Sequence, residues 1–178
     1  MIKHKEQRVG VFVDVANMYH SAKNLYGARV DFSEILKEAL AGRKLIRAIA
    51  YVIKSASVEE EGFFGALDKQ GFEVKLKDLQ VFVGGAKKAD WDVGLAVDAI
   101  KLADKLDTVI IVSGDGDYVP LVMYLKENKG CQVEVIAFGK TTSSKLIECV
   151  DDFVSIDNQQ RFLIKSKSQY KRKQTTKK

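Results

Sequence analysis

The sequence has few of the residues that build disulfide-linked or zinc-binding domains. Its 178 residues include two cysteines, Cys131 and Cys149, and two histidines, His4 and His20. The cysteines do not form a Cys-x-x-Cys pair. Neither a disulfide framework nor a zinc site is therefore indicated. We expect both cysteines to be small, half-buried structural residues.

Long hydrophobic runs are also missing. No apolar segment approaches the roughly 18 residues that a membrane-spanning helix needs, and the polar N-terminus passes directly into a strand pattern. These features predict a cytoplasmic protein without a membrane segment. A chain of 178 residues with 46% hydrophobic content is typical of one soluble globular domain with a substantial core.

Acidic residues are absent from the end of the sequence. Residues 161–178 contain eight lysines and arginines, and removing these eight charges from the net charge of +5 leaves residues 1–160 at about −3. Residues 165–178 have almost no apolar side chain apart from Tyr170, so they cannot repay the entropy cost of ordering. We therefore predict a folded domain over residues 1–160 and a basic, disordered tail over residues 161–178.

The rest of the chain is organised around residues 107–125. Five apolar or β-branched residues predict a strand buried on both faces, which ends in the turn Ser-Gly-Asp-Gly-Asp. Pro120 then opens a helix, because proline is tolerated in a first helical turn. Asp115 and Asp117 thus follow the carboxyl end of a strand, where open α/β sheets bind ligands.

Two readings of these two carboxylates are open at this point. Two carboxylates one residue apart in a glycine-rich turn suit a hard divalent cation. Alternatively, Asp115 shapes the turn and Asp117 caps the helix, since aspartate is common in both positions.

The first 76 residues alternate between strand and helix patterns. The capping box formed by Asp31 and Glu34 introduces one of these helices. The patterns predict strands at residues 9–13, 47–53 and 72–76, and helices from about residue 16, at 35–40 and at 58–70. Such alternation is typical of a parallel sheet.

Similar patterns continue in the second half of the chain. They predict a hairpin or an excursion strand at residues 77–85, helices at 92–106 and 143–150, and strands at 132–138 and 153–156. We therefore expect an α/β fold: a single Rossmann-like, three-layer domain with a mainly parallel central sheet and helices on both faces. The expected strand order is 3-2-1-4-5.

Two further carboxylates join the pair in the turn. Asp14 ends the first strand, which neighbours the strand before Asp115 in the expected order. Asp92 begins the long helix on its apolar face, so its carboxylate points inward. Four carboxylates at one edge would repel one another without a cation between them. The sequence therefore predicts a metal site of Asp14, Asp92, Asp115 and Asp117.

Asp98 lies on the more polar side of the same helix. It falls near Lys101 and Lys105 at helical spacing. We therefore expect an ordinary surface ion pair there.

Three segments also resemble the motifs of a known family. They are Asp14 with Asn17, Lys88 with the run Asp-Trp-Asp-Val-Gly-Leu-Ala-Val-Asp at residues 90–98, and Ser-Gly-Asp-Gly-Asp-Tyr-Val-Pro-Leu at residues 113–121. The chain is similar over residues 9–156 to the NYN domain family, and in particular to its bacterial LabA-like branch. The resemblance implies a PIN-like fold and a metal-dependent ribonuclease.

The resemblance also implies roles for individual residues. Carried over position by position, it implies Asp14, Asp92, Asp115 and Asp117 as the catalytic acids that bind Mg²⁺ or Mn²⁺, with Asn17, Asp98 and Ser113 as assisting groups. The sequence departs from many relatives at Asp90-Trp91, where they have glycine and an aliphatic residue. Trp91 either stacks on an RNA base or covers the sheet edge.

Hydrolysis of single-stranded RNA is the predicted function. A divalent cation held by carboxylates can activate water and stabilise the leaving 3′-oxygen, without histidine or cysteine. Lys88 is a candidate phosphate contact. Tail residues Lys171, Arg172 and Lys173 are candidates for an RNA-recruiting arm, although lysine-rich termini are also commonly just solvated.

Two other functions are left open. The alternatives to a ribonuclease are an RNA-binding module without turnover and, ranked lower, a phosphatase that uses Asp115 and Asp117. The phosphatase motif usually follows the first strand, where Asp14 stands here, and Asp151-Asp152 would be its later acidic pair. The sequence leaves the oligomeric state open, a homodimer included.

Overall fold

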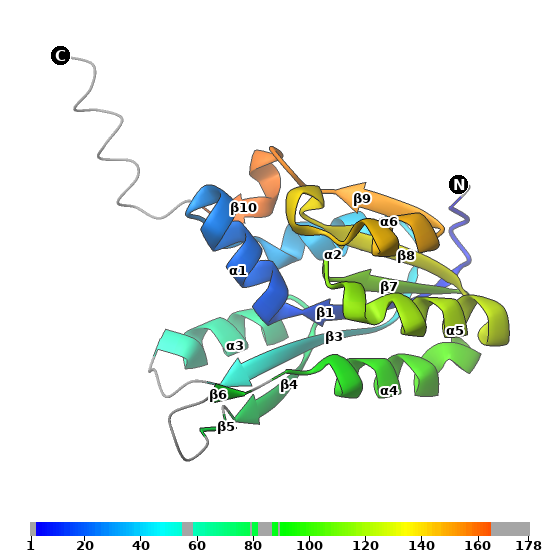
Figure 1. The fold of residues 1–178 in the computed structure, drawn as a ribbon, viewed down its shortest axis with the longest axis horizontal. Coiled ribbons are helices and arrows are strands. Elements are labelled where there is room, and N and C mark those ends of the chain that lie inside the picture. The colour runs from blue at the N-terminus through cyan, green and yellow to red at the C-terminus, as the bar shows by residue number, and fades with distance from the viewer. Residues whose placement is uncertain (1–2, 55–58, 79, 82–86, 89, 165–178) are drawn as a thin grey trace.

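A six-stranded sheet forms the centre of the fold (Figure 1). The computed structural model describes residues 3–54, 59–78, 80–81, 87–88 and 90–164. In spatial order, the strands of the sheet are β4 (Glu73–Asp78), β3 (Lys44–Lys54), β1 (Arg8–Asp14), β7 (Thr108–Val112), β8 (Gln132–Ala137) and β9 (Asp152–Ser155). All five pairings are parallel, so the predicted fold class and strand order are confirmed.

Helices cover both faces of this sheet and complete three layers. The connections between β1, β3 and β4 contain α1 (Val15–Tyr26), α2 (Phe32–Leu40) and α3 (Glu59–Lys69). The connections from β4 to β9 contain α4 (Asp92–Leu102), α5 (Val119–Lys129) and α6 (Ser144–Cys149). Figure 1 shows α4 and α5 side by side on one face, and α5 also packs against α6. Short 3₁₀ turns follow α4, precede α5 and α6, and lead into the last strand: η1 (Ala103–Lys105), η2 (Gly116–Tyr118), η3 (Gly139–Thr141) and η4 (Gln160–Phe162).

Local sequence signals explain most of these boundaries. The Asp31 carboxylate accepts hydrogen bonds from the backbone N–H groups of Ser33 and Glu34 and so caps α2, as its capping box predicts. Pro120 lies in the first turn of α5. All five residues of β7 are buried, because helices pack on both faces of a central parallel strand.

The register of the central strands brings polar residues to one edge of the sheet. Val13 of β1 pairs with Val112 of β7, so the next residues, Asp14 and Ser113, lie side by side. On the other side of β1, Asp14 itself pairs with Tyr51 of β3. The register of three neighbouring strands therefore places Ser113, Asp14 and Tyr51 in one row across the sheet.

Two antiparallel strand pairs lie outside the main sheet. One joins β2 (Arg29–Val30) to β10 (Leu163–Ile164), and the other joins β5 (Gln80–Val81) to β6 (Lys87–Lys88). At residues 77–85, where a hairpin or an excursion strand was expected, the structure has the end of β4 and then β5, whose antiparallel partner β6 lies just beyond that segment. Residues 29–30 and 163–164 were not expected to pair, because two-residue strands leave almost no pattern in the sequence.

Packing continues past the expected domain boundary at residue 160. Phe162 is fully buried in the core, and β10 follows it. The remaining part of the expected tail, including Lys171, Arg172 and Lys173, lies outside the described residues.

The half-buried position expected for both cysteines is found for Cys149, whereas Cys131 is more deeply buried. Cys131 is buried, with its thiol near the carbonyl oxygens of Ala103 and Leu106, and Cys149 is half-buried. Among the helices that the structure describes, none is long and apolar enough to cross a bilayer.

Candidate metal centre

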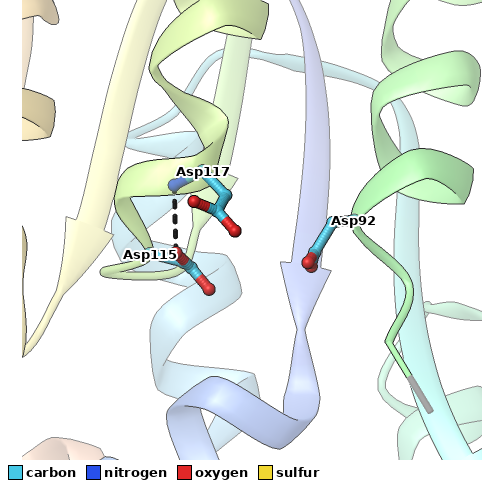
Figure 2. A group of neighbouring side chains, drawn as sticks. All are labelled: Asp92, Asp115 and Asp117. Carbon is cyan, nitrogen blue, oxygen red and sulfur yellow. Dashed lines mark hydrogen bonds between the residues drawn. The ribbon is translucent and has the colours of Figure 1, made fainter. Parts of the chain in front are cut away.

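Three carboxylates meet at the carboxyl edge of the sheet. Asp92 is the first residue of α4, and Asp115 and Asp117 come from the turn between β7 and α5. One oxygen of each carboxylate lies within 4.8 Å of the others. Figure 2 shows Asp92 facing Asp115 and Asp117 from the opposite side. The sequence predicted this convergence from elements that are far apart in the chain.

Asp115 has a second, structural task in this turn. Its carboxylate accepts a hydrogen bond of 3.0 Å from the backbone N–H of Asp117 and caps η2 (Figure 2). Asp115 thus shapes the turn, as the alternative interpretation supposed, but Asp117 does not cap the helix, because the N-cap of α5 is Tyr118 and makes no side-chain cap hydrogen bond. The cap engages one oxygen of Asp115, and Asp117 is left to face Asp92.

The two glycines of the turn allow the neighbouring loop to approach closely. A Cβ atom on Gly114 would lie 2.7 Å from Thr142 Oγ1 and 3.0 Å from Thr142 Cα. A Cβ atom on Gly116 would lie 2.8 Å from Ser143 Oγ. In addition, the backbone N–H of Gly114 donates a hydrogen bond to Asn17 Oδ1. This packing holds the turn, and with it the two aspartates, in place.

Asp14 lies beside the three carboxylates as a buried fourth acid. It is 9% exposed, and its carboxylate accepts hydrogen bonds from the Asn17 backbone N–H at 3.0 Å and from Ser113 Oγ at 3.3 Å. Burial raises the pKa of Asp14, and the nearby charges of Asp92 and Asp115 raise it further against these hydrogen bonds. The structure thus brings the predicted acids together, with Asp14 behind the group of three.

Tyr118 links Asp14 to the other acids. Its hydroxyl is buried, donates a hydrogen bond of 3.0 Å to Asp92 Oδ1 and lies 3.5 Å from Asp14 Oδ2. Burial and the neighbouring carboxylates raise the pKa of Tyr118, so its hydroxyl stays protonated and donates. The sequence analysis missed this residue, whose one signal was its position directly after Asp117.

The environment of Asp92 favours a bound cation. Burial raises the pKa of Asp92, the charges of Asp115, Asp90 and Asp117 also raise it, and the hydrogen bond from Tyr118 opposes them. A positive ion between the carboxylates would relieve the repulsion that raises this pKa. The donor atoms are all carboxylate oxygens, which are the ligands that Mg²⁺ and Mn²⁺ prefer. Asp92, Asp115 and Asp117 therefore fit a divalent cation.

A cleft opens in front of these acids. It has a volume of about 180 Å³ and is lined by Asp14, Ala16, Asn17, His20, Tyr51, Ile53, Asp90, Trp91, Asp92 and Asp115. His20, Tyr51 and Asp90 were not predicted to lie in the cleft, because nothing in their local sequence patterns distinguishes them. Their positions depend on how α1, β3 and the residues before α4 pack around the end of β1.

Asp98 forms an ion pair, but with Lys75 and not with Lys101 or Lys105 as the sequence predicted. Asp98 Oδ2 lies 2.6 Å from Lys75 Nζ of β4 and accepts a hydrogen bond of 2.8 Å from the Tyr51 hydroxyl. Burial acts to raise the pKa of Asp98, but the hydrogen bonds from Lys75 and Tyr51 lower it overall. Helical spacing indicates only lysines along the same helix, whereas Lys75 comes from β4. Asp98 is connected to the cleft through the hydrogen bond from Tyr51, because Tyr51 lines the cleft.

Trp91 lines the cleft and is held from several sides. Its Nε1 donates a hydrogen bond of 3.0 Å to the carbonyl oxygen of Val52, and a Cβ atom on Gly94 would lie 2.5 Å from the indole ring. The Lys77 ammonium lies 5.6 Å from the ring centroid, and the Tyr51 ring lies 5.4 Å away. These contacts match the interpretation that Trp91 covers the sheet edge. Stacking on a base stays a prediction.

Lys88, the other candidate RNA contact in this region, belongs to β6. Its side chain lies outside the described part of the chain. Its contact with phosphate stays a prediction.

Comparisons with known proteins agree with the fold and with the sequence motifs. The NYN domain family model matches residues 8–157. The chain is 23% identical over 171 residues to the low amplitude and bright protein LabA of Synechococcus elongatus, covering 91% of this chain and 90% of that protein. A crystal structure of a protein of unknown function from Vibrio parahaemolyticus superposes with a TM-score of 0.83 at 35% identity, covering 92% of this chain and all of that one.

Proposed function

Because the chain belongs to the NYN domain family, which is part of a nuclease superfamily, we propose that it is a ribonuclease that hydrolyses single-stranded RNA with Mg²⁺ or Mn²⁺. One observation carries the proposal. Three carboxylates, from Asp92, Asp115 and Asp117, each place an oxygen within 4.8 Å of the others. They do so at the sheet edge where α/β proteins bind ligands.

The carboxylates define what the site does chemically. When a divalent cation is bound, it supplies charge neutralisation at the phosphate, a lowered pKa for a water, and stabilisation of the leaving 3′-oxygen. Asp92, Asp115 and Asp117 would hold the cation. Asp14 completes the acidic set from the back of the cleft, so that the site binds cations rather than free phosphate.

The residues around the carboxylates set their positions. Tyr118 orients Asp92, Ser113 donates to Asp14, and Asn17 joins α1 to the turn through Gly114. Such partners of metal-holding groups fix their orientation and basicity. We therefore assign Asn17 and Ser113 an assisting role, as the family resemblance implies, and add Tyr118 to them.

One experiment separates this function from the two alternatives. Purified protein is incubated with labelled single-stranded RNA and with a generic phosphomonoester, each with Mn²⁺ and with EDTA. We expect cleavage of RNA with Mn²⁺ and none with EDTA. Hydrolysis of the phosphomonoester alone would favour the phosphatase, and RNA binding without product would favour the binding module.

A matched pair of variants controls for contaminating nuclease. Asp115→Asn removes one charge from the site, and Asp104→Asn removes one from η1, where Asp104 pairs with Lys129. RNA cleavage should disappear in Asp115→Asn and persist in Asp104→Asn. Equal cleavage in both variants would show that the activity does not come from this site.

A further inference from the structure

The cleft presents a charge problem for an RNA substrate. Four of the residues that line it are aspartates, and RNA is itself a polyanion. Among the described residues that line the cleft, His20 is the only one that can carry positive charge. An imidazole can donate a hydrogen bond in both its neutral and its protonated form, so it can contact a phosphate oxygen in either. His20 is therefore the natural lining residue to meet the RNA backbone.

The helix geometry directs His20 to the mouth of the cleft. Ala16, Asn17 and His20 all line the cleft, and their spacing of one and four residues places them on one side of α1. Met18 and Ala22 lie on the opposite side and are fully buried in the core. His20 is exposed, so its ring is available to a ligand rather than committed to packing.

The side chains of Tyr19 and Lys23 lie beside His20 on the exposed side of α1. The Tyr19 ring lies edge-on to His20, with centroids 5.5 Å apart, and is 41% exposed. The Lys23 ammonium lies 5.5 Å from the centroid of the Tyr19 ring, one helical turn beyond His20. Proteins hold single-stranded nucleic acid by stacking bases on exposed aromatic rings beside basic groups that can bind phosphate, and Tyr19 contacts two such groups.

We propose that Tyr19, His20 and Lys23 form an entry surface on α1 along which single-stranded RNA reaches the acidic cleft. This inference rests on the proposed function. His20 donates a hydrogen bond to the phosphate nearest the cleft, a base stacks on Tyr19, and Lys23 binds a phosphate further along the strand. In the contrasting structural explanation, Lys23 only complements the carbonyl end of α1 and covers the Tyr19 ring.

The two histidines of the chain allow a direct test of contact. Heteronuclear NMR of the histidine rings of the full chain gives one signal set for His20 and one for His4. His4 precedes β1, and Asp14 is the last residue of this seven-residue strand, which spans roughly 20 Å. Oligouridine is titrated into the protein with EDTA present, so that no cleavage follows. We expect the His20 signals to move in a saturable way and the His4 signals to stay. Unmoved His20 signals at saturating RNA would overturn the proposal.

Variants test the contributions of the other two residues. Tyr19→Ala should weaken oligouridine binding by roughly five- to one-hundred-fold, as expected for the loss of one stacked base. Lys23→Ala should reduce the slope of log affinity against log salt by about 0.7, the contribution of one phosphate contact. The matched controls are Tyr124→Ala on α5, where Tyr124 is 38% exposed, and Lys105→Ala in η1. Effects of equal size in the controls would overturn the proposal.

Steady-state cleavage kinetics, combined with the binding measurements, separate this inference from the proposed function. If the protein cleaves RNA with Mn²⁺ but Tyr19→Ala, His20→Ala and Lys23→Ala leave KM unchanged, the entry surface is refuted and the ribonuclease stands. If no metal gives cleavage but the His20 signals move and the variants weaken binding, the surface is supported and the ribonuclease is refuted. KM should rise in His20→Ala. His20→Arg keeps a hydrogen-bond donor for phosphate, so its KM should be close to that of wild type.

Discussion

The Tyr118 hydroxyl donates a hydrogen bond of 3.0 Å to Asp92 and so joins the first residue of α4 to the turn after β7. The two residues belong to different elements and are 26 positions apart in the chain. Because Asp115 and Asp117 belong to the same turn as Tyr118, this bond ties Asp92 to the segment that carries them.

Removing the Tyr118 hydroxyl should weaken cation binding. Tyr118→Phe keeps the buried ring but leaves Asp92 without its donor, so the carboxylate is free to turn away. We expect the Kd for Mn²⁺ to rise by roughly 10- to 100-fold, the usual cost of losing such a partner. Isothermal titration calorimetry measures this change. Tyr124→Phe, on the exposed face of α5, is the control, and an equal Kd in wild type and Tyr118→Phe would contradict the role of this bond.

Divalent cations should raise the melting temperature of the protein. A ligand at one hundred times its Kd stabilises the folded state by about 2.7 kcal/mol, which corresponds to roughly 5–10 °C for a domain of this size. Differential scanning fluorimetry with Mn²⁺ or Mg²⁺ should show this shift in wild type and in Asp104→Asn, but not in Asp92→Asn or Asp115→Asn. A full metal-induced shift in either site variant would show that the substituted carboxylate does not bind the cation.

Without metal, the site should make the protein less stable as the pH rises. Burial raises the pKa of Asp14 above its ordinary value, so between the two values the folded state binds a proton that the unfolded state does not. The contribution of Asp14 to stability therefore falls as pH rises through this interval. Asp14→Asn cannot ionise, and its stability relative to wild type should increase from about pH 4 to about pH 7. Urea unfolding in EDTA at both values measures the difference, and a difference that shrinks as pH rises would contradict this assignment.

Much of the fold and of the acidic site could be predicted from the sequence, because local sequence patterns indicate the strands, the helices and the strand order. Five apolar residues followed by a turn and Pro120 identify a buried strand and a helix, and the expected strand order brings Asp14 next to Ser113. Asp92 could be included because its helix periodicity showed which face is apolar.

Other parts of the site depend on tertiary packing that no local pattern records. Asp98 pairs with Lys75 of β4, which lies 23 residues earlier in the chain, whereas helical spacing indicates only lysines along the same helix. Tyr118 and His20 are also ordinary in their local sequence. Their places in the site come from the packing of η2 and α1 around the end of β1.

The basic tail should recruit RNA without sequence preference. Residues 165–178 carry seven positive charges, and each phosphate contact with single-stranded RNA adds about −0.7 to the salt slope of binding. Deleting these residues should therefore flatten the slope and weaken binding most at low salt, while metal affinity stays unchanged. RNA affinity of the full-length and truncated proteins across a salt series tests this, and parallel slopes would leave the tail only a role in solubility.

The rate of RNA cleavage in Asp92→Asn, set beside wild type and Asp104→Asn in Mn²⁺, tests the central claim most directly. The claim is that Asp92, Asp115 and Asp117 jointly hold the cation that cleavage needs. We predict that Asp92→Asn loses more than about a hundredfold in rate, exceeding the usual cost of losing an outer partner of a metal ligand. We also predict that Asp104→Asn matches wild type and that the products carry a 5′-phosphate and a 3′-hydroxyl. Equal rates in Asp92→Asn and wild type would contradict the claim.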